Sequence, residues 1–322
     1  MNTKPKSSDN TSTDKVQIVM ATYNGERYLG AQIESIIHQT HVDWHLLIRD
    51  DGSTDNTIDI IKQYAAQDSR ISLVSDNMGN LGYIKNFYHL LSMTSEHYIC
   101  ICDQDDIWHS EKIATSLQKL KALETEQRIP ALVHSDAAVV DSNLNVISER
   151  FIGNRGKKEG INGLLFANSV QGASVMINSA LRNYALRLMP DIPYDYHLAL
   201  IAELIGRRAF IPEPLLNYRQ HSNNVIGAKK EGEVKQNENK ISSSLKISLG
   251  LYPFVKNVYS HVDTSDMNRQ YLAEYCYLFE GKSRLKKSYI FLKNFYPFYR
   301  RKDQLTCFAL LILGRDLKAL CQ

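Results

Sequence analysis

The chain has 322 residues, of which 43% are hydrophobic and 23% charged, and this composition excludes disordered, collagen-like and disulfide-rich proteins. Its formal net charge of +3 lacks the strong basic excess of a nucleic-acid-binding protein, so we expect no nucleic-acid partner. The five cysteines show no paired spacing, which favours a reducing, cytoplasmic environment.

Strands and helices are expected to alternate along the first two thirds of the chain. Residues 1–14 are polar and lack the apolar run of a signal peptide, so we expect a disordered tail. The expected strands are VQIVMA, HLLIRD, ISLVSD, YICICD and ALVHSDAAVVD, and the expected helices span 27–38, 54–67, 81–92 and 111–123. This alternation is typical of βαβ units. It predicts an α/β domain over 15–228 with a mostly parallel, Rossmann-like sheet flanked by helices.

The last third of the chain differs in composition and charge. Residues 229–244 are rich in Lys, Glu, Gln and Asn and are expected to form a linker or surface helix, and 245–322 a helical appendage. Residues 1–224 hold 21 basic and 26 acidic side chains, a net of −5, whereas 225–322 hold 17 and 9, a net of +8. The apolar run 307–313 is shorter than the ~20 residues that span a bilayer, so we expect no transmembrane helix.

The basic appendage has an amphipathic segment between residues 281 and 302, with eight basic residues and no acidic one. Such a segment is typical of a helix that lies on anionic lipids. A helix that packs its apolar side on the catalytic domain, with its lysines in water, remains the alternative. The apolar residues at helical spacing are Leu285, Tyr289, Leu292 and Tyr296, with Phe295, Phe298 and Tyr299 nearby.

Polar clusters follow three of the expected strands, beginning at Thr22, Asp50 and Asp103. In an open parallel sheet, ligands bind at the carboxyl ends of the strands. Local turn chemistry explains Gly52 and the Ser53 that follows it, because glycine accepts a positive φ and serine caps helices. It does not explain two adjacent acids at the end of a strand. We therefore favour a ligand-binding role for Asp50 and Asp51.

The cluster after the fourth strand places three carboxylates within the four residues 103–106. Such crowding beside an apolar strand is unfavourable unless a cation neutralises it, and Mg²⁺ or Mn²⁺ suits oxygen ligands. We favour metal or ribose contacts for Asp103 and Asp105 and a helix-start role for Asp106, with a solvated acidic loop as the alternative. No glycine-rich phosphate loop is present, which leaves the metal and isolated cations such as Lys85 or Arg219 to hold a nucleoside diphosphate.

Four motifs resemble, in order and spacing, the family 2 glycosyltransferases, which have a GT-A fold. They are Thr22-Tyr23-Asn24-Gly25, Asp50-Asp51-Gly52-Ser53-Thr54-Asp55, Asn80-Leu81-Gly82 with Lys85-Asn86-Phe87, and Asp103-Gln104-Asp105-Asp106-Ile107-Trp108. Three later segments look like the rhamnosyltransferase-type branch that builds bacterial cell-surface polysaccharides. They are Gln171-Gly172-Ala173, Tyr194-Asp195-Tyr196-His197-Leu198-Ala199-Leu200 and Tyr218-Arg219-Gln220-His221-Ser222-Asn223-Asn224-Val225. The resemblance covers about residues 16–228.

The resemblance implies an inverting, metal-dependent hexosyltransferase. It would move rhamnose from a nucleoside-diphosphate donor to a growing polysaccharide, with a UDP-hexose donor as the alternative. We expect a lipid-linked acceptor and a protein that is peripheral on the inner face of the plasma membrane. A non-catalytic scaffold subunit is a further alternative, against which the intact acids argue. A metal-dependent phosphatase or nucleotidyltransferase fits less well, because Asp106 stands where the phosphatase pattern has Thr or Val and no glycine-rich nucleotidyl loop follows the first strand.

Each motif position implies a role. The nucleotide would be bound by Thr22, Tyr23, Asp50, Asp51, Lys85, Asp103 and Arg219. The Mg²⁺ or Mn²⁺ ion would be bound by Asp105 and His221. Asp195 would be the catalytic base, with Gln171, Gly172 and Tyr194 on the acceptor side. The resemblance departs at Tyr194, where related enzymes usually have His, so no acceptor or orienting role carries over from that histidine. From its local sequence alone, Asp195 is equally well an N-cap residue, and the two roles are compatible.

Overall fold

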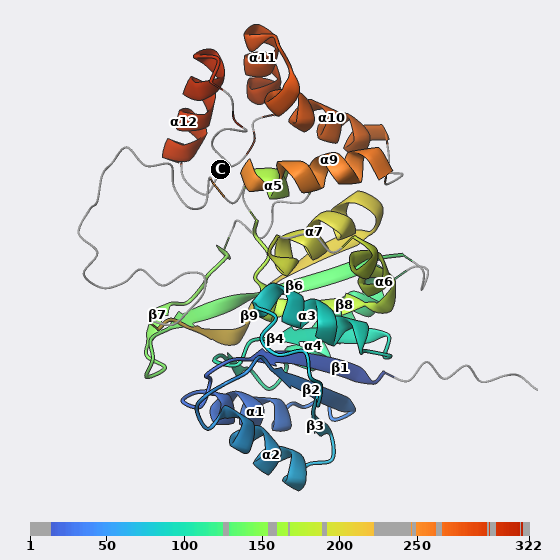
Figure 1. Ribbon diagram of the computed structural model, residues 1–322, viewed down its shortest axis with the longest axis vertical. Helices are drawn as coiled ribbons and strands as arrows, with labels where there is room; N and C mark the ends of the chain where they lie inside the picture. The colour runs from blue at the N-terminus through green and yellow to red at the C-terminus, as the bar shows by residue number, and fades with distance from the viewer. Residues whose placement is uncertain are drawn as a thin grey trace, which may run out of the picture.

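The computed structural model describes residues 14–124, 129–153, 160–166, 168–188, 192–221, 246, 249–261, 266–294, 296, 301–315 and 317. The tail expected over 1–14 lies outside the described residues except for Asp14, and the linker or surface helix expected over 229–244 lies wholly outside them. The expected α/β fold with helices at the C-terminal end is confirmed (Figure 1).

The N-terminal half of the sheet is parallel, in the order β3-β2-β1-β4. Its strands are β1 (Val16–Thr22), β2 (Trp44–Asp50), β3 (Ile71–Leu73) and β4 (Tyr98–Cys102). The helices between them are α1 (Leu29–Ile37), α2 (Thr57–Gln67) and α3 (Tyr83–Ser92). The register sets Thr22 opposite Asp50 and Met20 opposite Cys102. The polar residues that follow these strands therefore meet at one edge of the sheet.

Beyond β4 the sheet is mixed and continues in the order β8-β6-β9-β5. The strands are β5 (Ile107–Trp108), β6 (Ala131–Val140), β7 (Val146–Ser148), β8 (Val175–Asn178) and β9 (Arg207–Arg219). β8 is antiparallel to both β4 and β6, β5 is antiparallel to β9, and β6 is parallel to β9. The sheet is thus parallel only over its first half and in the β6–β9 pair. Because β8 runs against β4, the residues before β8 lie at the edge where β4 ends.

Both faces of the sheet are covered, and successive side chains of β1 point to opposite faces. Ile18 and Met20 belong to a core with α1, α2 and α4 (Lys112–Leu123), whereas Val19 belongs to a core on the other face. That second core includes residues of α3, α5 (Ile161–Phe166), α6 (Ser179–Arg187) and α7 (Tyr194–Ile205). A short 3₁₀ helix, η2 (Gly172–Ser174), precedes β8.

The C-terminal helices extend the second core: the first two contact α5 and α7, the third packs on the second, and the fourth packs on the third (Figure 1). They are α9 (Tyr252–His261), α10 (Asp266–Glu280), α11 (Arg284–Asn294) and α12 (Arg301–Ile312). The Tyr275 ring lies 5.5 Å from the Phe166 ring, and the Asn268 amide donates to the Glu203 carbonyl at 3.1 Å. The described residues of the appendage therefore share one core with α5 and α7. Across the part of the chain that is described, no helix is both long and apolar enough to cross a membrane.

Candidate active site

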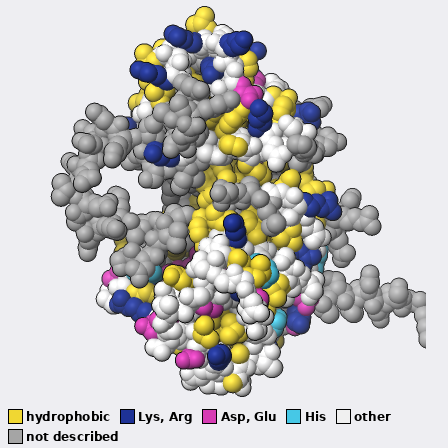
Figure 2. Space-filling model, in the orientation of Figure 1, with side chains coloured by type: hydrophobic (Ala, Val, Ile, Leu, Met, Phe, Trp, Pro, Cys, Tyr) yellow, Lys and Arg dark blue, Asp and Glu magenta, His cyan; other side chains and the backbone are white. Residues whose placement is uncertain are grey.

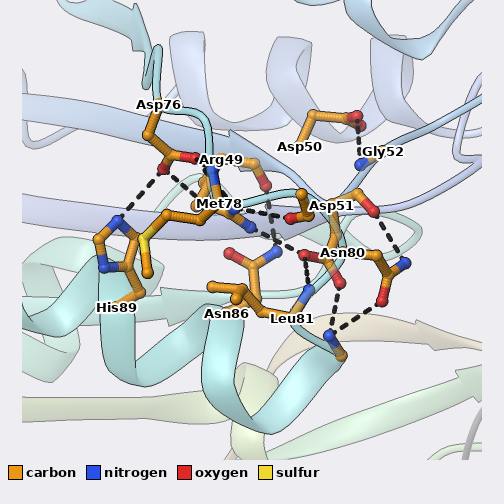
Figure 3. Close-up of polar contacts among 12 residues, drawn as sticks. Arg49, Asp50, Asp51, Gly52, Asp76, Met78, Asn80, Leu81, Asn86 and His89 are labelled. Carbon is orange, nitrogen blue, oxygen red and sulfur yellow. Dashed lines mark hydrogen bonds and ion pairs between the residues drawn. The ribbon is translucent and has the colours of Figure 1, made fainter.

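The two acids at the end of β2 are held by protein donors (Figure 3). Asp50 accepts hydrogen bonds from the Thr22 hydroxyl at 3.0 Å, from the Ser53 hydroxyl at 2.6 Å, and from the Gly52 and Ser53 amides at 3.0 and 2.7 Å. Asp51 accepts bonds from the Leu81 and Gly82 amides at 2.7 and 2.8 Å. These bonds join β1, β2 and the loop before α3. A nucleotide contact by either acid stays a prediction.

Arg49 is the buried cation behind this edge, and the sequence motifs do not include it. Its guanidinium lies 2.8 Å from Asp51 and 2.8 Å from Asp76, and its side chain is 2% exposed. The bond from Arg49 is the largest effect that lowers the pKa of Asp76. The loop from Asp76 to Gly82 is therefore held against β2 by one arginine and its carboxylates. The sequence signal is an arginine within an expected strand, directly before the two acids.

The loop after β1 is joined to the acidic loop, residues 103–106, through Gln104. The Tyr23 amide donates to Gln104 Oε1 at 2.9 Å, and Gln104 Nε2 donates to the Tyr23 carbonyl at 3.0 Å. A Cβ on Gly25 would lie 2.3 Å from Gln104 Oε1, so only glycine leaves room for this contact. The Tyr23 side chain is 50% exposed beside it. Gln104 had no predicted role.

Asp105 and His221, predicted as metal ligands, are brought together by the pairing of β5 with β9. Asp105 Oδ2 lies 2.8 Å from His221 Nε2. Arg219 supports the same loop: its Nε donates to the Asp105 carbonyl at 2.8 Å and its amide to Asp106 Oδ1 at 3.0 Å. The ring of Tyr28, which the motifs missed, stacks on His221 at 4.8 Å and lies 4.5 Å below the Arg219 guanidinium.

The acidic loop concentrates negative charge in a poorly solvated place. Burial, followed by the charges of Asp105 and Asp195, raises the pKa of Asp103 to about 7, against a smaller opposing hydrogen bond from Tyr194. Asp106 is fully buried, and burial raises its pKa well above the usual range. Asp106 therefore supports the loop from inside, while Asp103 and Asp105 are only partly buried. Because Asp195 directly follows Tyr194, which forms a hydrogen bond with Asp103, the predicted base lies near the acidic loop.

Asp195 lies in the first turn of α7, whose N-cap is Pro193, so the alternative N-cap role is wrong. Its Oδ2 accepts a hydrogen bond from Asn168 Nδ2 at 2.9 Å, and its Oδ1 accepts one from the Tyr196 amide at 2.9 Å. Burial raises the pKa of Asp195 to about 6, and these hydrogen bonds limit the rise. Asn168 is buried and was missed, because nothing in its local sequence indicates a contact 27 residues away.

The predicted acceptor-side residues line the same edge. Tyr194 is buried and its ring lies 4.5 Å from Phe87 of α3. A Cβ on Gly172 would lie 2.1 Å from the Tyr194 hydroxyl oxygen, so Tyr194 fills the space that glycine leaves. Gln171 is 8% exposed, and within the described residues neither atom of its amide has a hydrogen-bond partner. An unsatisfied buried amide destabilises by about 1–3 kcal/mol, which a bound hydroxyl would relieve.

Lys85 lies exposed in the first turn of α3, directly after the loop that Asp51 holds. The structure thus places the other predicted residues around the edge formed by the ends of β1, β2, β4 and β9 and the start of α7. Lys85 is at the periphery of this edge, where a flexible ammonium can reach an anion as a point charge.

The residues present fit a hard divalent ion. In the described parts of the chain no group of three or more His, Cys, Asp or Glu side chains is arranged to hold a metal. One carboxylate, Asp105, and one imidazole, His221, are adjacent, and Asp103 lies two residues away. An ion that keeps several waters and binds substrate phosphates needs only one or two carboxylates from the protein. The donor set therefore suits Mg²⁺ or Mn²⁺ bound together with a diphosphate.

Comparisons with known proteins bear on the family to which the chain belongs. Residues 17–183 match the family model "Glycosyl transferase family 2". An uncharacterised glycosyltransferase of Haemophilus influenzae is 29% identical over 221 residues, which are 65% of this chain and 66% of that protein. The dTDP-rhamnosyl transferase RfbG of Shigella flexneri is 28% identical over 225 residues, which are 65% of this chain and 74% of RfbG.

Among solved structures, residues 1–349 of TarS from Staphylococcus aureus, in complex with UDP-GlcNAc, match with a TM-score of 0.57 at 13% identity. The match covers 94% of this chain and 92% of the TarS chain. At that identity the likeness speaks for the fold, which is GT-A. The family model covers more than half of the residues and includes the ends of β1, β2 and β4 and the acidic loop. The chain belongs to glycosyl transferase family 2.

Proposed function

We propose that the protein transfers rhamnose from dTDP-rhamnose to a growing cell-surface polysaccharide, with inversion at the anomeric carbon. The observation that supports this proposal is the position of Asp195 in the first turn of α7, directly after Tyr194, whose side chain forms a hydrogen bond with Asp103 of the acidic loop. A base near a diphosphate-binding loop is what a single displacement requires. The catalytic unit would be residues 15–228, with 245–322 as its basic C-terminal region, whose described residues are mainly helical.

The donor nucleotide would be held at the ends of β1, β2 and β4. The half-exposed Tyr23 ring offers a face for the base, and Asp103 offers acceptors to the ribose hydroxyls. Thr22, Asp50 and Asp51 are close to the same place, and their hydrogen bonds keep the loops in one geometry. This fixed geometry reduces the conformational freedom lost on binding.

The diphosphate would be held by cations on both sides of the acidic loop. Asp105 and His221 would hold Mg²⁺ or Mn²⁺, which supplies electrostatic stabilisation of the leaving diphosphate when bound. Arg219 is buried and bonded to backbone carbonyls, so its charge acts from a fixed position. Lys85 is exposed and would reach the phosphates as a mobile cation.

Asp195 would act as the general base. Its carboxylate takes the proton of the acceptor hydroxyl while the hydroxyl oxygen bonds to the anomeric carbon. On the opposite side of the sugar the bond to the diphosphate breaks, so the configuration inverts. Because burial raises the pKa of Asp195 to about 6, the group is ionised at pH 7 and yet a stronger base than an ordinary aspartate. Asn168 positions it.

The acceptor would lie along Gln171, Gly172 and Tyr194. The unpartnered Gln171 amide can bond a sugar hydroxyl as both donor and acceptor. Tyr194 limits the space above Gly172 and therefore the size of what enters there. We propose that the acceptor is lipid-linked and that the protein acts at the inner face of the plasma membrane, because the C-terminal region is strongly basic.

A UDP-hexose donor is the second candidate, since TarS, which shares the fold, was solved with UDP-GlcNAc. Nucleoside diphosphate release from a panel of nucleotide sugars, with Mg²⁺ or Mn²⁺ and a lipid-linked glycan acceptor, tests both. We expect the fastest release with dTDP-rhamnose, and none from Asp195→Asn although that variant still binds the donor. Faster release with a UDP-hexose would replace the rhamnosyl assignment. Release by Asp195→Asn near the wild-type rate would remove Asp195 from its role, and no release with any donor would favour a scaffold subunit.

A further inference from the structure

Helix α11 exposes a stripe of large apolar side chains. Leu285 is 85% exposed, Tyr289 66% and Leu292 60%. Their spacing of i, i+4 and i+7 puts them on one side of the helix, and Ile290 and Phe291 are buried on the other. Tyr296, which the sequence placed in the same row, is fully buried, because it packs against Phe166 at 4.9 Å. Phe295, Phe298 and Tyr299 lie outside the described residues.

Helix α12 repeats the pattern at the same spacing. Leu305 is 60% exposed and Ile312 50%, Ala309 between them is also exposed, and Leu313 extends the row. Cys307 and Leu311 are buried on the opposite side. The two helices pack through their inner sides, where the rings of Phe291 and Phe308 stack at 5.7 Å. The inner sides therefore pack the two helices together, whereas the two outer stripes are exposed among the described residues.

Basic side chains surround these stripes. Lys282 and Lys286 lie within one turn of the α11 stripe, and Arg301 and Lys302 precede the α12 stripe. Among the described residues after 280 the only acid is Asp303, which is buried. Figure 2 shows Lys and Arg side chains interspersed with hydrophobic ones at the end of the molecule formed by α11 and α12. Exposed leucines within a positive surface match the chemistry of an anionic lipid headgroup layer.

We propose that the outer stripes of α11 and α12 form one docking face that inserts into an anionic lipid surface. The proposal deepens the proposed function, since it names the surface through which the enzyme would reach a lipid-linked acceptor. A second copy of this chain is a poorer occupant, because it would bring the same positive charges against each other. A bilayer accepts separate apolar side chains at shallow depth and needs no complementary groove, and none of the described helices spans it.

The test is co-sedimentation of the full chain with vesicles of phosphatidylcholine alone or with one third phosphatidylglycerol. We expect binding to the anionic vesicles only, weakened by salt. The variant Leu285→Gln/Leu292→Gln/Leu305→Gln should bind at least tenfold less. Lys282→Gln/Lys286→Gln should bind less by about fivefold for each charge removed. Val42→Gln, which changes a 68% exposed valine on the catalytic domain, is the matched control and should bind normally.

Nucleoside diphosphate release in solution, measured on the same proteins, separates the docking face from the catalytic proposal. If the leucine variant releases diphosphate normally but does not bind vesicles, the docking face stands. If no protein releases diphosphate while wild type still binds vesicles, only the proposed function fails. Equal binding of wild type and the leucine variant, or equal binding to both kinds of vesicle, overturns the docking face. So does a wild-type dimer that the leucine substitutions dissociate without a change in vesicle binding.

Discussion

Asn168→Ala should shift the pH dependence of transfer to higher pH. Asn168 donates a hydrogen bond to Asp195 at 2.9 Å, and this bond favours the ionised carboxylate. Burial favours the neutral acid, and without the Asn168 donor fewer hydrogen bonds oppose this effect. The pKa of Asp195, raised by burial to about 6, should therefore rise further.

The size of the pKa shift follows from the strength of the Asn168–Asp195 hydrogen bond. A hydrogen bond to a charged group contributes about 1.5–3 kcal/mol, and one pKa unit corresponds to about 1.36 kcal/mol. Because water can replace part of the lost donor, we expect a rise of about one unit. At pH 7 the ionised fraction of the base would then fall from about nine tenths to about one half, and it would recover above about pH 8.

The assay is nucleoside diphosphate release with donor, metal and acceptor between pH 5 and 9. The wild-type rate should rise with a midpoint near 6, and Asn168→Ala should rise about one unit later. Asn145→Ala is the matched control, since Asn145 donates a bond of 2.9 Å to Asp141 at an exposed site. It should leave the profile unchanged. A wild-type midpoint near 4, or an Asn168→Ala midpoint at or below the wild-type one, would refute the reasoning.

Three further outcomes are expected. Arg49→Ala should lower the free energy of unfolding in urea by about 3–5 kcal/mol, because it leaves the buried carboxylate of Asp51 without its cation. The control Lys121→Ala removes an exposed ion pair and should lower this free energy by less than about 1 kcal/mol. Equal losses in the two variants would contradict the prediction. Gly172→Ala should displace Tyr194 and raise the KM for the acceptor. The double variant Gly172→Ala/Tyr194→Ala should bring this KM part of the way back to the wild-type value. An unchanged KM in the single variant argues against a crowded acceptor side. EDTA should stop sugar transfer, and added Mg²⁺ or Mn²⁺ should restore it. Asp105→Ala should require a higher metal concentration for half-maximal activity. Transfer that continues in EDTA rejects the proposed metal dependence.

The sequence by itself determined the first half of the sheet and the edge at which the site lies. Apolar strands followed by polar clusters are local patterns, and parallel strands necessarily bring their carboxyl ends together. The clusters at Thr22, Asp50 and Asp103 could therefore be assigned to one place without coordinates. The motifs also identified Asp105 with His221, and the structure has them in contact.

Only the tertiary structure decided which partners hold these groups. Asp50 and Asp51 looked free for a ligand, but amides, hydroxyls and Arg49 occupy them, because a carboxylate at a strand end can bond donors from neighbouring loops. The bond of Asn168 to Asp195 spans 27 residues, and that of Tyr23 to Gln104 spans 81.

The C-terminal appendage also shows a feature that local sequence leaves undecided. Helical spacing placed four aromatic and aliphatic residues in one row, yet Tyr296 lies beyond the end of α11 and packs inside, while Leu285, Tyr289 and Leu292 face solvent. Periodicity specifies which residues share a side of a helix but not which side the rest of the molecule covers. That choice depends on contacts with distant elements, which only the folded chain brings together.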